Sequence, residues 1–309
     1  MKKSLYIIIF LIITISSCLL SFKSDTTTTM SETDASKSAI DEVKFFSAIT
    51  DEAFYEKVFS NPIDLTDDIF INESITASEI LSYNEYRKQW EGQMQQTLCV
   101  LKAELTEAEY QKLLLSQSAW EEYMTATSTL EQNLYYLDGV VGNGMSYPMT
   151  SLVRADRTRA RTLELMSFEF LLTNDIQFVE KADLEGHNER WCIRASDNFF
   201  VVTQEEEFYH QIAQISSTNN SAQKEYWVAI KNQALEGLEK GLVVSDYELL
   251  VQADTAWKEY INLTNIIEHS LLRDDDNLIE QLYVDRLKAE AVTVLSYKFS
   301  IESEDWHIA

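Results

Sequence analysis

The sequence predicts an all-α protein, and three observations support this fold class. The 309 residues include only 7 glycines and 2 prolines, whereas all-β folds need a turn about every ten residues. Apolar residues recur at spacings of three and four over long segments, which is the period of a helix with one buried face. The third observation is a repeat, because Ala119–Tyr123 returns 137 positions later as the near copy Ala256–Tyr260.

The repeat predicts two structural units in the chain. At the same offset Tyr110 aligns with Tyr247, and Leu113 aligns with Leu250. We therefore expect two tandem helical-bundle units of about three long helices each. Their expected bounds are 39–175 for the first unit, 176–203 for a linker, and 204–309 for a second, degenerate unit.

The N-terminal segment has the features of an export signal. A positive start at Met1–Lys3 precedes the mostly apolar run Leu5–Ile15, which is too short for a membrane span of about 20 residues. The four residues ending in Cys18 resemble the bacterial lipobox, so we expect a signal peptide at 1–17, a lipidated Cys18 and a flexible tether over 18–38. These features place the protein in the bacterial cell envelope, anchored by lipid. An ordinary cleaved signal with an incidental cysteine and an uncleaved anchor are the alternatives.

Helical spacing predicts four helical segments in the first unit. One covers 39–60 and ends before Pro62, because a residue that precedes proline disfavours the helical conformation. Capping boxes at Thr76–Glu79 and Thr106–Glu109 open the next two, which run to about Glu104 and Leu137. Three glycines and a proline make 138–148 a loop, and the last helix covers 149–173.

The second unit repeats this order with shorter connections. We expect helices over 221–240, 245–272 and 277–301, the middle one opened by a capping box at Ser245–Glu248. Tyr226 aligns with Tyr86 at an offset of 140, which implies that three residues are lost at the following turn. Asp285-Arg286 aligns with Asp156-Arg157 at an offset of 129, so the last connection is shorter.

Several residues of the first unit follow the order of a known family motif. They are Gln117, Trp120 and Tyr123 on one helix, Gly142-Asn143-Gly144 in the loop, and Thr158, Arg161 and Leu165 on the next helix. This order resembles the LprI-like lysozyme-inhibitor domain family, with Gln-x-x-Trp-x-x-Tyr, a glycine-containing loop and Thr-x-x-Arg-x-x-x-Leu. The resemblance covers about residues 83–170 and, more weakly, 225–299. It implies a helical domain that binds a lysozyme.

The chain also departs from the family pattern. Thr127 stands where family members commonly have a cysteine, and no cysteine occurs near Arg154, so the family's disulfide is absent. In the second copy Asp254 replaces Gln117, and Glu290 stands where Arg161 stood. We therefore expect the fold to carry over better than the activity, and the first unit to be the one that binds a partner.

Two further groups of residues are candidates for function. Both copies keep Trp-x-x-Tyr, whose three-residue spacing lets both rings pack on one neighbouring helix. We interpret these rings, with Arg161, as packing residues beneath a site, and a helix-packing motif in an unrelated bundle is the alternative. They are Trp120, Tyr123, Trp257 and Tyr260. The candidates for partner contact are the loop residues Gly142, Asn143, Gly144, Ser146 and Tyr147, since exposed glycine and aromatic residues can reach a cleft. A plain connection between helices is the alternative.

The composition is strongly acidic, with 25 Lys and Arg residues against 51 Asp and Glu residues and a net charge of −26. Such a chain repels phosphate backbones, which argues against nucleic acid as a partner. It attracts cationic proteins and accelerates their encounter. A surface that serves only solubility is the alternative reading of the same charge.

No pattern of an enzyme or a metal site stands out. Four histidines are scattered without zinc-ligand spacing, and no nucleophile elbow or nucleotide loop occurs. We therefore expect no cofactor and no metal. Cys99 and Cys192 could pair in an oxidising compartment, or Cys99 could be a buried single thiol beside an apolar stripe.

The sequence thus favours a non-enzymatic envelope lipoprotein that binds a cationic protein. By the family resemblance, this partner would be a lysozyme. The alternative is a structural or scaffolding lipoprotein that binds an envelope partner or dimerises, and its mark would be a large exposed apolar patch.

Overall fold

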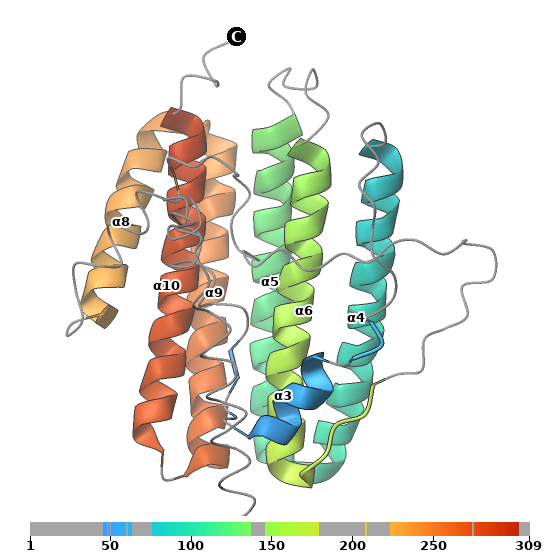
Figure 1. Ribbon diagram of the computed structural model, residues 1–309. Helices are drawn as coiled ribbons and strands as arrows, with labels where there is room; N and C mark the ends of the chain where they lie inside the picture. The colour runs from blue at the N-terminus through green and yellow to red at the C-terminus, as the bar shows by residue number, and fades with distance from the viewer. Residues whose placement is uncertain are drawn as a thin grey trace, which may run out of the picture.

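The computed structural model describes residues 46–47, 49, 51–59, 61–63, 76–136, 146–178, 208, 223–273 and 275–302. These residues form seven helices and no strand, which confirms the all-α fold class. Six of the helices are long and lie side by side, and the short α3 packs across one end of α6 (Figure 1). The bounds are α3 Glu52–Phe59, α4 Thr76–Glu104, α5 Glu107–Tyr136, α6 Ser146–Thr173, α8 Gln223–Gly241, α9 Val244–Leu272 and α10 Asp276–Glu302.

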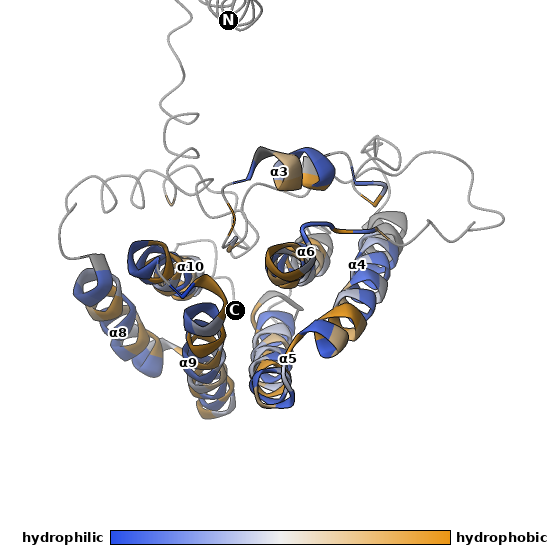
Figure 2. Ribbon diagram, turned by 90° about the horizontal axis from the view of Figure 1, so that it is seen from below, coloured by the Kyte–Doolittle hydropathy of each residue, from blue (hydrophilic) through white to orange (hydrophobic). Residues whose placement is uncertain are grey.

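We call α3–α6 the first half of the molecule and α8–α10 the second half. The two helices that carry the repeated motif, α5 and α9, pack against each other where the two halves meet. Seen end-on, they lie side by side at the centre, with α4 and α6 on one side and α8 and α10 on the other (Figure 2). Ser116 and Thr264 share a hydrogen bond of 2.7 Å, and Asn133 donates one of 2.7 Å to Asp246. Because the residue number rises in α5 as it falls in α9, the two helices are antiparallel.

The first connection has the same length in both halves. Helix α4 ends at Glu104 and α5 begins at Glu107, while α8 ends at Gly241 and α9 begins at Val244. Both bounds of the second half therefore lie 137 positions after those of the first half. No residues are lost at this turn, so the expected loss of three residues is wrong.

The correct alignment pairs different aromatic residues. At an offset of 137 Trp227 corresponds to Trp90, and both indole rings are buried. Tyr226 is only half-buried, whereas Tyr86 is buried, so the alignment of these two tyrosines fails. The alignment at an offset of 140 relied on the dipeptide Glu-Tyr, which occurs at 85–86 and at 225–226. It is wrong because equivalent buried positions are set by the position of each residue along the helix, and this keeps the offset of 137.

The glycine-rich connection is shorter than the sequence suggested. Helix α6 begins at Ser146, three residues before the expected start, so Ser146 and Tyr147 belong to its first turn and not to the loop. Pro148 is tolerated there because the first N–H groups of a helix have no partner within the helix. The expected loop residues Gly142, Asn143 and Gly144 lie outside the described residues.

One expected capping box is present and another is not. Thr106 Oγ1 accepts from the N–H of Glu109 at 3.4 Å, and the Glu109 carboxylate accepts from the N–H of Thr106 at 3.0 Å. At the start of α9 the N-cap is Val243, which offers no side-chain acceptor, so the box expected at Ser245 does not form. The side chains of the box expected at Thr76 lie outside the described residues.

Replacing Thr106 with alanine is expected to lower the free energy of unfolding by about 1 kcal/mol, because it removes the acceptor for a helix N-terminal N–H. Thr125→Ala is the matched control, since Thr125 is an exposed threonine within α5 whose hydroxyl donates only to the carbonyl of Glu121. Urea denaturation of both variants measures the difference. Equal stabilities would contradict a capping role for Thr106.

The apolar core is continuous across the two halves. One cluster of buried residues draws on all six long helices and includes Trp120, Tyr123, Trp257 and Tyr260. The ring centroids of Tyr123 and Trp257 are 4.6 Å apart, and those of Trp257 and Tyr260 are 5.1 Å apart. Three of the four motif rings, those of Tyr123, Trp257 and Tyr260, therefore pack where α5 meets α9, whereas Trp120 lies between α4, α5 and α6.

Candidate functional site

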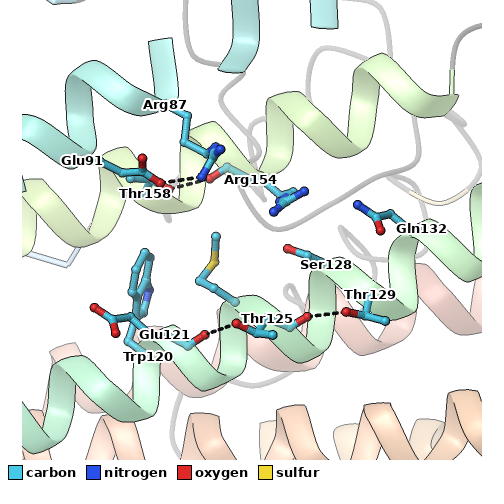
Figure 3. A pocket seen from close by; sticks show the side chains of 11 residues that line it. Arg87, Glu91, Trp120, Glu121, Thr125, Ser128, Thr129, Gln132, Arg154 and Thr158 are labelled. Atoms are coloured by element: carbon cyan, nitrogen blue, oxygen red, sulfur yellow. Dashed lines mark hydrogen bonds and ion pairs between the residues drawn. The ribbon is translucent and has the colours of Figure 1, made fainter. Parts of the chain in front are cut away.

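Helices α4, α5 and α6 enclose a groove of about 310 Å³. Trp120 and Met124 supply its apolar wall, and most of the remaining lining is polar (Figure 3). The lining residues are Arg87, Glu91, Trp120, Glu121, Met124, Thr125, Ser128, Thr129, Gln132, Arg154 and Thr158.

Two guanidinium groups face this groove. Arg87 pairs with Glu91 of its own helix at 2.5 Å. Arg154 of α6 extends into the space opposite Ser128 and Gln132 of α5 (Figure 3). Ser128 is 5% exposed, and its hydroxyl has no hydrogen-bond partner among the described residues. The end of the groove near Arg154 therefore presents a cation and an unused hydroxyl together.

The second half contains an equivalent groove of about 480 Å³ between α8, α9 and α10. At the repeat offsets, Asn262, Asn265 and His269 occupy the places of Thr125, Ser128 and Gln132, and Tyr283 occupies the place of Arg154. The groove is thus a property of the repeated helical unit. Its lining differs between the copies, and the guanidinium of α6 has no equivalent on α10.

Buried ion pairs lie beneath the grooves and are also repeated. Arg157 of α6 donates to Glu131 of α5 at 2.7 Å, and the corresponding Arg286 of α10 forms a two-pronged pair with Glu268 of α9. All four side chains are at most 1% exposed. Each pair joins the second and third long helices of its own half.

Arg286 also connects the two halves of the molecule. It donates to Glu164 of α6 at 2.9 and 2.5 Å, and Glu164 accepts further hydrogen bonds from Arg161 and, at 2.8 Å, from Tyr260. Burial raises the pKa of Glu164, but the neighbouring Arg286 and Arg161 outweigh it and hold this pKa below its usual value. Glu164 is therefore an ionised carboxylate between two cations.

Arg161 has a different counterpart in the second half. Its Nε donates to Gln117 at 3.1 Å, and Gln117 in turn contacts the Met94 sulfur. At the same places the second half has Glu290, Asp254 and Lys231.

Lys231 balances the charge of the carboxyl groups of Asp254 and Glu290. Its ammonium donates to Asp254 and to Glu290, each at 2.6 Å. The replacement of Arg161 by Glu290, which looked like a loss from the sequence, is therefore balanced by a lysine at the position of Met94. Burial raises the pKa of Glu290 to about 8, whereas Lys231 keeps the pKa of Asp254 below its usual value despite burial.

The unfolding free energy is expected to fall by about 3–4 kcal/mol between pH 5 and pH 8 through Glu290. A carboxyl whose folded pKa lies near 8, above an unfolded value of 4.5, stabilises the fold while protonated and loses this contribution as pH rises. Urea titrations at both pH values measure the effect. Glu290→Gln should flatten the dependence, and a residual slope of the same sign is expected from Glu169, whose pKa burial raises to about 7.

The structure leaves part of the expected site outside the described residues. Cys18 and Cys192 fall there, as do Gly142, Asn143 and Gly144. Cys99 carries a free thiol and is exposed, so the expectation of a buried thiol is wrong; it points away from the apolar stripe of α4.

Sequence reasoning missed the groove residues Ser128 and Arg154 and the compensating Lys231. If the offset of 137 had also been applied to α4 and α8, the sequence alignment would have shown that Lys231 is equivalent to Met94. Nothing in the sequence alone distinguishes Ser128 from the other hydroxyl residues of α5.

Neither a metal cluster nor a membrane-spanning helix occurs in the described part of the chain. No three His, Cys, Asp or Glu side chains there are grouped to hold a metal ion, and none of its helices is both long and apolar enough to cross a bilayer.

Comparison of the chain with protein-family models, with curated proteins and with solved structures finds no match. The likeness to lysozyme inhibitors therefore rests on the quoted motif residues alone.

Proposed function

We propose that this protein is a non-enzymatic binding protein of the bacterial envelope that captures a cationic protein on an acidic surface. The observation that carries the proposal is the charge balance of the interior. Among the described residues, five buried cations face six buried carboxyl groups, so the core of this part is nearly balanced and its excess of acidic residues lies outside the core. The buried set is Arg157, Arg161, Lys231, Arg286 and Lys288 with Glu131, Asp156, Glu164, Glu169, Glu268 and Glu290.

Complementary charge is a physical reason for such a surface to select cationic partners. It steers encounter over a range of about 8–10 Å at physiological salt. The outer face of the α5–α9 pair carries exposed carboxylates, among them Glu122, which accepts a hydrogen bond from Gln252 across the pair, and Glu259. The family resemblance suggests a lysozyme as the partner, and the lipobox-like Cys18 suggests a lipid anchor.

The test is the lysis of bacterial cell walls by a panel of basic lysozymes in the presence of the full chain. We expect binding at low salt that weakens as salt rises, and slower lysis by the lysozyme that binds. A variant with Glu107, Glu122, Glu248 and Glu259 changed to glutamine should associate more slowly, whereas Gln111→Ala on the same face should not. Unchanged lysis together with no binding at low salt refutes the proposal.

A second candidate is a scaffolding role through apolar contact. Exposed apolar side chains on the central helices favour it: Leu114, Leu115, Val251 and Ile266, with Val244 at the start of α9. Leu115 lies one heptad before Glu122, and Ile266 two heptads after Gln252, so both belong to the outer face of the α5–α9 pair. Sedimentation of the full chain at low and high salt separates the two roles, because apolar self-association persists in salt and charge-driven capture does not.

A further inference from the structure

We propose that the groove between α4, α5 and α6 binds a neutral sugar through Ser128, Gln132 and the apolar wall at Trp120. This site is separate from the capture of a cationic protein, and it does not depend on that function. All three side chains belong to α5 and line the groove together (Figure 3). A hydroxyl, an amide and an aromatic wall are groups that bind an uncharged polar molecule.

The hydroxyl of Ser128 is the observation that points to a ligand. Ser128 is 5% exposed, and its Oγ has no hydrogen-bond partner among the described residues. Figure 3 shows this oxygen on the side of α5 that faces the groove. Buried polar groups in proteins almost always have a partner, because an unsatisfied one carries a desolvation cost. A ligand hydroxyl placed beside Ser128 would supply the missing hydrogen bond.

The charged side chains of the groove already have partners. Arg87 pairs with Glu91 at 2.5 Å, and Glu121 accepts a hydrogen bond of 3.0 Å from Gln117. Arg154 also interacts with another residue. An ionic ligand would therefore have to displace an existing partner, whereas a neutral ligand would not.

The hydroxyl groups on the walls narrow the class of neutral ligand. Thr125, Thr129 and Thr158 line the groove, and each donates to the carbonyl oxygen of the residue four positions earlier, at 2.8 to 2.9 Å. A hydroxyl group has one hydrogen, so these three oxygens can only accept from a ligand. Ser128 and Gln132 can both donate and accept. A ligand rich in hydroxyl groups, each of which donates and accepts, matches this lining.

The apolar wall favours a sugar ring over an open-chain polyol such as glycerol. Trp120 and Met124 form this wall, and a sugar ring presents C–H groups that can pack against it. Among the described residues, the indole of Trp120 makes no hydrogen bond and no ring pair. The groove volume of about 310 Å³ is within the range of small-molecule sites.

The second groove serves as an internal comparison. Trp257, the counterpart of Trp120, is only 1% exposed and is not among the residues that line this groove. Its aromatic ring is that of Tyr283, and the ammonium of Lys224 lies over this ring at 4.4 Å from the centroid. The second groove thus lacks a free aromatic wall, so one sugar site is expected per chain.

Titration of the full chain with the methyl β-glycosides of glucose, galactose and N-acetylglucosamine tests the proposal. The ¹³C-methyl signal of Met124, assigned with Met124→Leu, reports on the groove. We expect at least one of these sugars to shift the signal saturably below about 50 mM, a range that includes weak single-ring ligands. The fully O-methylated form of that sugar keeps the ring but cannot donate, so it should bind about tenfold more weakly or worse.

Variants decide whether the named side chains are responsible. Ser128→Ala and Gln132→Leu should each weaken sugar binding by about threefold to tenfold, which is the contribution of one hydrogen bond. Asn265→Ala changes the residue at the place of Ser128 in the second groove, and this matched control should leave the affinity unchanged.

Thermal melting without sugar separates binding from a structural role. Ser128→Ala removes a hydroxyl that has no partner among the described residues, so it should not lower the melting temperature. A lower melting temperature would mean that this hydroxyl already stabilises the fold, against the proposal. No shift with any of the three sugars, equal binding of the O-methylated form, or wild-type affinity in both variants also overturns the assignment.

Discussion

Replacing Arg286 with alanine is expected to lower the free energy of unfolding by about 3–5 kcal/mol, because breaking a buried ion pair leaves a charge without compensation. Arg286 is fully buried and pairs with Glu164 and Glu268 at 2.5 Å each. Glu164 would still pair with Arg161. Glu268 would lose the cation that holds it, so most of the cost falls on this carboxyl.

Urea denaturation at pH 7 measures the loss, and two further variants interpret it. Lys298→Ala removes a cation from a partly exposed pair with Glu302, and its expected effect is below about 1 kcal/mol. Adding Glu268→Gln to Arg286→Ala should recover part of the stability, because the abandoned carboxyl becomes neutral. If Arg286→Ala were no more harmful than Lys298→Ala, the bridge between the halves would not contribute to stability.

The sequence predicted the helices well because their signals are local. Apolar spacing and the capping box at Thr106 identify the six long helices, whose bounds agree with the structure to within a few residues. The helix expected over 39–60 is wrong in its first part, because the described residues 46–47, 49 and 51 are not helical and α3 covers only Glu52–Phe59. The antiparallel packing of α5 on α9 could not be predicted, because it depends on which of several apolar faces meet in three dimensions. The error in the alignment of Tyr226 has the same origin, since only packing shows that Trp227 and Trp90 occupy equivalent places.

The candidate groove could not be predicted for a related reason. Arg154 and Ser128 are 26 residues apart in the sequence, and both look like ordinary polar positions on helices. They can be recognised as neighbours only in the structure, where α6 lies against α5 and both side chains line the same groove. Arg161 was recognised from a motif, but its partner Glu164 and the charge that crosses from Arg286 were not.

Replacing Lys231 with methionine, the residue at the equivalent place in the first half, is expected to lower the free energy of unfolding by about 3 kcal/mol. Lys231 is 2% exposed and is the cation between Asp254 and Glu290. Its removal leaves two neighbouring carboxyl groups to repel each other. The loss should be smaller at pH 5 than at pH 8, because a protonated Glu290 needs no cation.

The recovery of this variant tests whether charge or shape is the cause. Adding Asp254→Asn and Glu290→Gln to Lys231→Met removes all three buried charges of the cluster and leaves only the half-exposed Lys258, which pairs with Asp254 from the same helix. The new side chains can hydrogen-bond to each other, so most of the stability should return. If Glu290 is changed to arginine instead of glutamine, together with Lys231→Met and Asp254→Asn, the stability should not return. In the first half Arg161 depends on Glu164, and the equivalent residue on α10 is Thr293, which carries no charge. If the neutral triple variant stayed as unstable as Lys231→Met, the lost packing of the lysine stem, and not the charge, would explain the effect.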